Sequence, residues 1–128
     1  MPHTTIEYTA NVATHHDVDA LVGAIHDAAL SLELAHIGGY RTRAAQRDLY
    51  RVADGDPNFA FIAMTVRIGP GRPDDVKQEI IMTLLDAGEA QLATESSPLV
   101  VAWSLEVQEI DANFRENRNH VTTNIKER

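Results

Sequence analysis

The second residue of the chain is a proline, and its place beside Met1 offers a chemistry that internal prolines lack. Methionine aminopeptidases remove an initiator methionine when the next residue is small, and their action would leave Pro2 with a free secondary amine. An α-amino group has a pKa of about 8 in water. Burial and neighbouring arginines disfavour its charged form, so the amine would suit proton transfer near neutral pH. From the dipeptide alone, an ordinary chain start is the commoner explanation.

Three arginines are placed where they could bind an anion. Arg41 and Arg43 are two residues apart on an expected strand, so their side chains share one face. Arg72 follows a Gly-Pro-Gly bend where a helix should begin, and backbone N–H groups at a helix start attract anions. Guanidinium groups keep their charge and bind carboxylates through paired hydrogen bonds. The three could form a cationic cluster in a chain of net charge −8, although each taken singly is more often a surface residue.

The composition excludes several kinds of chemistry. The chain has no cysteine, which rules out disulfides, thiolate metal sites and cysteine nucleophiles. Its six histidines show no metal-ligand spacing, and we expect neither a metal nor a cofactor. A net charge of −8 disfavours nucleic-acid binding. No apolar run approaches the roughly 20 residues of a membrane span, and no secretory signal is visible. We therefore expect a cytoplasmic protein without membrane or nucleic-acid partners.

The first half of the chain predicts a strand, a helix and a second strand. Residues 4–9 alternate and are rich in threonine, as is typical of a strand. Apolar residues recur at three- and four-residue steps over 18–32, which predicts an amphipathic helix. Thr14 is its expected N-cap, with Asp17 completing a variant of the capping box. A glycine pair ends this segment, and a second strand is expected over 40–46.

The second half predicts the same order of elements. Residues 59–68 are almost entirely apolar, as expected of a central strand buried on both faces. Pro73 fits the first position of a helix whose apolar stripe extends to Ala87. A last strand is expected over 99–107. The polar segment 111–128 is expected to be partly disordered or to wrap a neighbouring subunit.

The two halves resemble each other at an offset of 58 positions, which pairs Val18 with Val76 and Ala29 with Ala87. We therefore expect a single α+β domain, 1–128, with a four-stranded sheet and two helices on one face. Its parts are a first βαβ half (1–57), a second βαβ half (58–110) and a polar tail (111–128).

The order of elements leaves two topologies open, namely two parallel βαβ halves and the ferredoxin-like split arrangement. Either one leaves a sheet face bare. Self-association is the simplest way to cover such a face, so we expect a homo-oligomer.

Taken together, these residues resemble the 5-carboxymethyl-2-hydroxymuconate Δ-isomerase family of the tautomerase superfamily. The resemblance covers most of the chain, and its more specific parts are the Ile-Gly-x-Gly-Arg stretch and the tail. The first helix and residues 44–49 depart from the family pattern, which affects the pocket wall and the preferred substrate. The matching segments are Met1–His3 with Glu7, Arg41–Arg43, Ala53–Gly55, Phe59–Arg72, Glu95–Ser96, Asn113–Arg115 and Asn119–Val121.

The resemblance implies a tautomerase fold, in which a pseudo-twofold axis relates two parallel βαβ halves, and a homotrimer. It implies an isomerase that converts a 2-hydroxymuconate-type dienol acid, first of all 5-carboxymethyl-2-hydroxymuconate, to its conjugated 2-oxo isomer. This reaction belongs to homoprotocatechuate degradation, a route of aromatic catabolism. Pro2 matches the family's catalytic amino-terminal proline, and Arg41 and Arg72 match its substrate-binding arginines. The partner is a small polycarboxylate, and no metal or cofactor is implied.

The predicted site occurs once per chain, because at the offset of 58 Ala60 and Leu99 stand where Pro2 and Arg41 would recur. Two other functions stay open. One is a different tautomerase-superfamily enzyme, such as a dehalogenase or hydratase acting on an unsaturated acid. The other is a non-enzymatic, oligomeric ligand-binding protein that keeps Met1.

Overall fold

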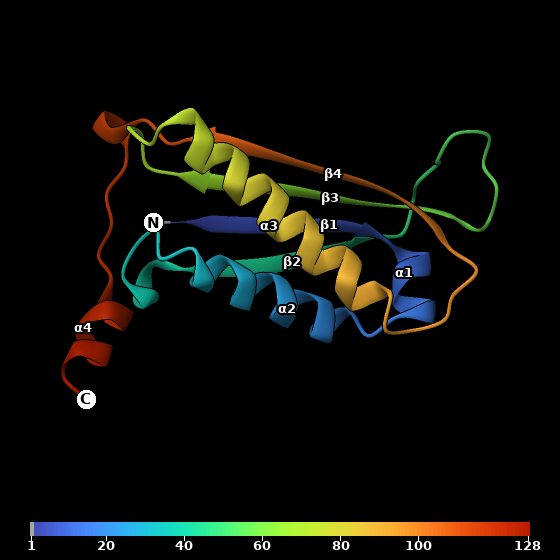
Figure 1. Ribbon diagram of the computed structural model, residues 1–128, viewed down its shortest axis with the longest axis horizontal. Coiled ribbons are helices and arrows are strands. Elements are labelled where there is room, and N and C mark those ends of the chain that lie inside the picture. Colours follow the sequence, from blue (N-terminus) through green and yellow to red (C-terminus); the bar gives the residue numbers. More distant parts are fainter. Residues whose placement is uncertain (1) are drawn as a thin grey trace.

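A computed structural model describes residues 2–128 and shows a four-stranded sheet with two long helices across one face (Figure 1). This is the α+β architecture that the sequence predicts. In chain order the elements are β1 (His3–Thr9), α1 (Ala10–His15), α2 (Val18–Ser31), the 3₁₀ helix η1 (Ile37–Gly39), β2 (Arg41–Arg47), β3 (Phe59–Ile68), α3 (Asp74–Leu92), β4 (Val100–Glu109), the 3₁₀ helix η2 (Ala112–Phe114) and α4 (His120–Lys126).

The strand pairing decides between the two topologies that the sequence leaves open. The sheet has the order β2-β1-β3-β4, with β1 parallel to β2, β3 parallel to β4, and β1 antiparallel to β3. Each parallel pair is joined through a long helix, so the fold consists of two parallel βαβ halves. The antiparallel central pair relates the halves by a pseudo-twofold axis and brings the start of β1 to the end of β3.

The core lies between the sheet and the two long helices. The periodicity of both helices is confirmed, since α2 and α3 turn their apolar stripes toward the strands. Aliphatic side chains fill this layer because aromatic residues make up only 5% of the sequence. The fully buried side chains include Ile6, Leu21, Ile25, Ile62, Met64, Ile80 and Leu84.

The start of α2 differs from the prediction. Asp17, not Thr14, is its N-cap, and the Asp17 side chain accepts a hydrogen bond from the Ala20 N–H at 3.0 Å. Thr14 lies inside α1, a six-residue helix that the sequence did not reveal. Only Val12 is buried in α1, so it has no apolar periodicity to detect. In the second half, Pro73 is the N-cap of α3 rather than its first helical residue.

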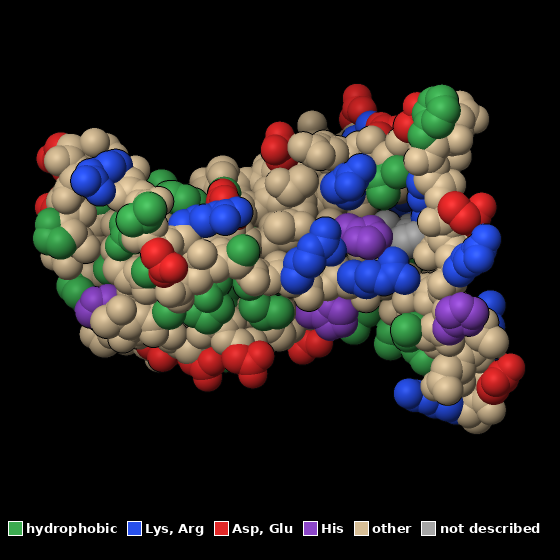
Figure 2. Space-filling view, turned by 180° about the vertical axis from the view of Figure 1, so that it is seen from behind, with side chains coloured by type: hydrophobic (Ala, Val, Ile, Leu, Met, Phe, Trp, Pro, Cys, Tyr) green, Lys and Arg blue, Asp and Glu red, His purple; other side chains and the backbone are tan. Residues whose placement is uncertain are grey.

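The prediction that β3 is buried on both faces is wrong for the chain by itself. Burial alternates along the strand, and side chains at 60, 62, 64, 66 and 68 are buried while those between them are half-buried or exposed. The helices cover one face alone. We call the other face, which carries His3, Glu7, Arg41, Arg67 and their neighbours, the open face; Figure 2 looks onto it.

The sequence predicts a tail that is partly disordered or wraps a neighbouring subunit, and in the structure this segment contains the two short helices η2 and α4. Asn119 caps α4 by accepting from the Thr122 N–H at 3.1 Å, and its side-chain amide donates to the Gly38 carbonyl at 2.9 Å. A Cβ added to Gly38 would lie 2.4 Å from the Thr122 hydroxyl oxygen. The tail thus returns to η1, directly before β2, as Figure 1 shows at the end of the molecule where the chain begins.

A close approach between α3 and β4 gives a test of this packing. A Cβ at Gly88 would lie 2.7 Å from the Trp103 ring. We expect Gly88→Val to lower the free energy of unfolding in urea by about 1–3 kcal/mol, because the overpacked ring must move. Gly23→Val in α2 is the control, since no heavy atom lies within 4 Å of its added Cβ. Equal stability of the two variants would contradict the packing.

Candidate active site

The starts of β1 and β2 and the end of β3 meet at one end of the open face. His3 is paired with Arg41 on β2 and with Arg67 on β3, so the three side chains form one row across neighbouring strands. The tail crosses the same end. Figure 2 shows basic side chains gathered there. This end of the face contains an open pocket of about 410 Å³. The pocket is lined by His3, Arg41, Arg43, Arg67, Ile110, Phe114, Arg115, Glu116 and Asn117.

Pro2 lies directly beside this pocket. It is buried, and its carbonyl oxygen accepts a hydrogen bond from the Arg41 N–H at 3.1 Å. This bond extends the β1–β2 ladder by one step and fixes the proline against the first residue of β2. The structure therefore brings together two of the three candidate residues, Pro2 and Arg41.

The third candidate, Arg72, has a different partner. Its guanidinium donates a hydrogen bond to the Leu34 carbonyl oxygen, in the loop that leads from α2 to η1. The Tyr40 hydroxyl accepts hydrogen bonds from the Leu34 and Ala35 N–H groups and holds the same loop. Arg72 follows β3 and so lies at the correct end of the sheet, but it does not line the arginine-rich pocket.

His3 lies between two guanidinium groups. Its Nε2 is 3.3 Å from an Arg41 nitrogen, and its Nδ1 is 3.3 Å from an Arg43 nitrogen. Burial lowers the pKa of His3, and the positive charges of Arg41, Arg43 and Arg67 lower it further. The imidazole is therefore neutral at pH 7, and a neutral ring accepts a hydrogen bond at one nitrogen alone.

Arg115 is a pocket residue that sequence reasoning missed as a candidate, although Asn113–Arg115 contributed to the resemblance. The Ile110 N–H donates to the Ile68 carbonyl at 2.8 Å, which carries the chain past the end of β3 and over the basic row. The match of Asn113–Arg115 to the family was the available sequence signal. The position of Arg115 depends on the path of the tail, which periodicity does not predict.

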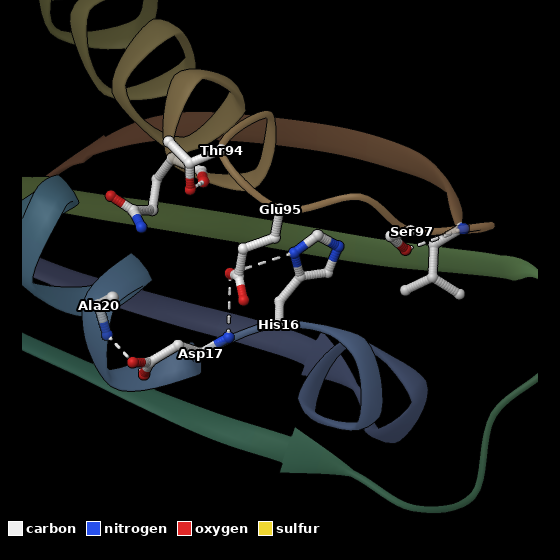
Figure 3. A network of polar contacts seen from close by, with 8 residues as sticks. His16, Asp17, Ala20, Thr94, Glu95 and Ser97 are labelled. Atoms are coloured by element: carbon white, nitrogen blue, oxygen red, sulfur yellow. Dashed lines mark hydrogen bonds and ion pairs between the residues drawn. The ribbon is translucent and has the colours of Figure 1, made fainter.

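A second polar cluster lies at the opposite end of the helices (Figure 3). The buried His16 Nδ1 is 3.5 Å from a Glu95 oxygen, and the same oxygen accepts from the Asp17 N–H at 3.2 Å. These contacts join the α1–α2 junction to the turn after α3, so we interpret the cluster as structural. Over residues 2–128, no group of three or more acidic, histidine or cysteine side chains could hold a metal. In the same residues, no helix is long and apolar enough to span a membrane.

The fold is of the tautomerase type. A crystal structure of a 5-carboxymethyl-2-hydroxymuconate delta-isomerase superposes with a TM-score of 0.85 at 22% identity, covering 98% of this chain and 93% of the other.

The chain itself belongs to the 5-carboxymethyl-2-hydroxymuconate isomerase family, whose model matches residues 2–125. It is 26% identical over 122 residues to the 5-carboxymethyl-2-hydroxymuconate Delta-isomerase of Escherichia coli, covering 94% of this chain and 97% of the relative. A 5-carboxymethyl-2-hydroxymuconate isomerase structure from Deinococcus radiodurans R1 is 27% identical, with a TM-score of 0.80 and coverage of 97% and 93%. The chain is therefore an enzyme of the isomerase class.

The environment of His3 predicts an unusual titration. By NMR, we expect its titration midpoint below the ordinary value of about 6.5, and Arg43→Gln should raise it because one repelling charge is gone. Arg51→Gln, an exposed site outside the pocket, is the control. The unfolded chain binds this proton at higher pH than the folded chain, so His3 should lower stability as pH falls below about 6.5. A midpoint at or above 6.5 would contradict this electrostatic account.

The contact of the tail with η1 predicts that Gly38→Val releases α4. The new side chain must displace Thr122, so we expect faster hydrogen–deuterium exchange across 120–126 with little change in the central strands. Asn124→Ala, on the exposed side of α4, is the matched control. Unchanged exchange in the Gly38 variant would show that α4 is held by other contacts.

Proposed function

We propose that this enzyme converts 5-carboxymethyl-2-hydroxymuconate, or a closely similar dienol acid, to its conjugated 2-oxo isomer, with Pro2 as the acid–base group after Met1 is removed. The observation that carries the proposal is the hydrogen bond between Pro2 and Arg41, which sets the amino-terminal proline at the edge of a basic pocket. The names printed for the relatives support the substrate class.

The proposed reaction moves one proton. The dienol carries a hydroxyl on C2 and double bonds at C2=C3 and C4=C5. Neutral Pro2 accepts the hydroxyl proton, the C2 oxygen becomes a carbonyl, and the electron pair shifts along the chain to C5. Pro2 then returns a proton to C5, which leaves a C3=C4 bond conjugated with the new carbonyl. An amine close to neutral pKa suits both transfers.

The arginines would stabilise the charge that develops during this transfer. Arg41 would bind the carboxylate beside the reacting oxygen, where a fixed cation lowers the energy of the transition state. We keep Arg72 as the second proposed substrate arginine. A guanidinium has five N–H donors, and the hydrogen bond to Leu34 uses one of them. No metal or cofactor is needed in this scheme, because the dienol hydroxyl itself supplies the proton.

The proposed assembly is a homotrimer with the open face covered by neighbouring copies. Small side chains such as Ala45, Ala63 and Ser104 line a hollow on this face, and because they project little from the sheet, another subunit can approach it closely. A solved structure with the same fold, described as a fused 4-OT symmetric trimer, has a TM-score of 0.60. The proposed compartment is the cytoplasm, in agreement with a chain that has no cysteine.

The test combines intact mass with the ultraviolet change on isomerisation of 5-carboxymethyl-2-hydroxymuconate. We expect the active protein to lack Met1. Arg41→Gln and Arg72→Gln should each lower kcat/KM by about 10²–10³-fold, as for other lost transition-state contacts. Arg51→Gln is the charge-matched control and should leave kcat/KM unchanged.

A glutamate inserted between Met1 and Pro2 should block processing and leave the nitrogen acylated, so activity should vanish while the fold persists. Pro2→Ala should cost about 10²–10⁴-fold, the usual range for an acid–base group. Full turnover by protein that retains Met1 would refute the role of Pro2. A trimmed protein that turns over no dienol would refute the proposed reaction.

A further inference from the structure

Two arginines of the pocket, Arg43 and Arg67, have no role in the proposed reaction. Arg67 lies in the row of His3 and Arg41, on the far side of His3. Arg43 lies two residues beyond Arg41, and its register partner Thr5 follows His3 by two on the same face. Both side chains are exposed. Neighbouring strands are roughly 4.8 Å apart, so the backbones of Arg41 and Arg67 are separated by roughly 10 Å.

Neither Arg43 nor Arg67 forms an ion pair with a carboxylate in residues 2–128. The contrast with Arg47 is direct, since that residue of the same strand and face pairs with Glu7 at 2.6 Å. On this face Arg47 therefore has an acidic partner on the neighbouring strand. The residues around His3 are arginines instead, although the whole chain has a net charge of −8.

The acids nearest this cluster leave it positive. Glu116 lines the pocket from the tail, and its carboxylate accepts a hydrogen bond from the Asn117 N–H at 3.0 Å. Glu106 on β4 is the strand-register partner of Thr65, which precedes Arg67 by two residues. Glu106 lines a separate pocket on the open face. Four arginines therefore face one glutamate within the pocket. Such an excess of guanidinium groups is complementary to a ligand with more than one carboxylate.

We infer that Arg43 and Arg67, on either side of His3, form a second carboxylate subsite, which binds a carboxylate of the substrate remote from the reacting C2 oxygen. The inference rests on the proposed function for the identity of that substrate. It makes the enzyme selective for polycarboxylic over monocarboxylic dienols. Arg43 and Arg67 act in binding, whereas Pro2 and Arg41 act on the reacting atoms.

The state of His3 gives the subsite a pH signature. Burial lowers the pKa of the free imidazole, and the charges of Arg41 and Arg43 from β2 and of Arg67 from β3 lower it further. Glu116 from the tail lines the same pocket. A bound carboxylate adds a negative charge, which favours the imidazolium and raises the pKa of His3. The complex then binds more protons than the free enzyme. By linkage, polycarboxylate affinity should rise as pH is lowered toward the pKa of His3 in the complex.

The experiment measures KM and kcat for 5-carboxymethyl-2-hydroxymuconate in Arg43→Gln and Arg67→Gln, with Arg51→Gln as control. Losing a charge-assisted contact to a carboxylate should raise KM by about 10- to 100-fold and change kcat less than threefold. Calorimetry with propane-1,2,3-tricarboxylate should show the same loss of affinity, and inorganic phosphate should bind far more weakly. Arg43→Lys and Arg67→Lys, which keep the charge, should restore part of the affinity.

Unchanged KM in both glutamine variants would overturn the subsite, as would a fall in kcat at constant KM. Phosphate binding as tight as that of the tricarboxylate would also overturn it, because the cluster would then recognise any small oxyanion. Failure of the proposed function has a different result. The trimmed wild-type enzyme would isomerise no dienol, yet would bind propane-1,2,3-tricarboxylate through Arg43 and Arg67, and the subsite would stand.

Discussion

The antiparallel pairing of β1 with β3 is the constraint on which the rest of the structure depends. The first strands of the two halves, β1 and β3, run in opposite directions. The start of β1 therefore lies beside the end of β3. The His3–Arg67 pair is a direct result. Parallel pairing of β1 with β2 then adds Arg41 to the same row. A parallel central pair would have placed Arg67 at the other end of the sheet, and the basic pocket would not exist.

The electrostatics of this pocket follow from that geometry. Long guanidinium side chains from two strands meet around one imidazole, and burial together with repulsion keeps the ring neutral. The chain has a net charge of −8, yet four arginines and one glutamate line this pocket, so the pocket is locally positive. The cluster attracts anions locally while the overall charge repels them at a distance. Recognition by this enzyme therefore depends on short-range contacts, with little long-range attraction of the substrate.

The two ends of the chain are coupled through η1. The tail binds Gly38 through Asn119 and packs Thr122 against it, and β2 begins three residues after Gly38. Arg41, the first residue of β2, then donates its N–H to Pro2. The carboxy-terminal helix therefore supports the amino-terminal proline through a single short turn. The tail thus acts on the proposed site in two ways, through this backbone support and through Arg115, Glu116 and Asn117, which line the pocket.

The sequence by itself determined the elements whose signal is local. The periodicity of α2, the apolar run of β3 and the Gly-Pro-Gly-Arg-Pro bend each result from neighbouring residues, and the offset of 58 positions predicts two similar halves. It also singled out Pro2, Arg41 and Arg72 as candidate site residues. Only the tertiary structure decided the sense of the β1–β3 pairing, the engagement of Arg72 with Leu34 and the arrival of Arg115 at the pocket. These depend on contacts between residues far apart in sequence, and hydrophobic periodicity carries no information about which strands pair or where a long polar side chain finds its partner.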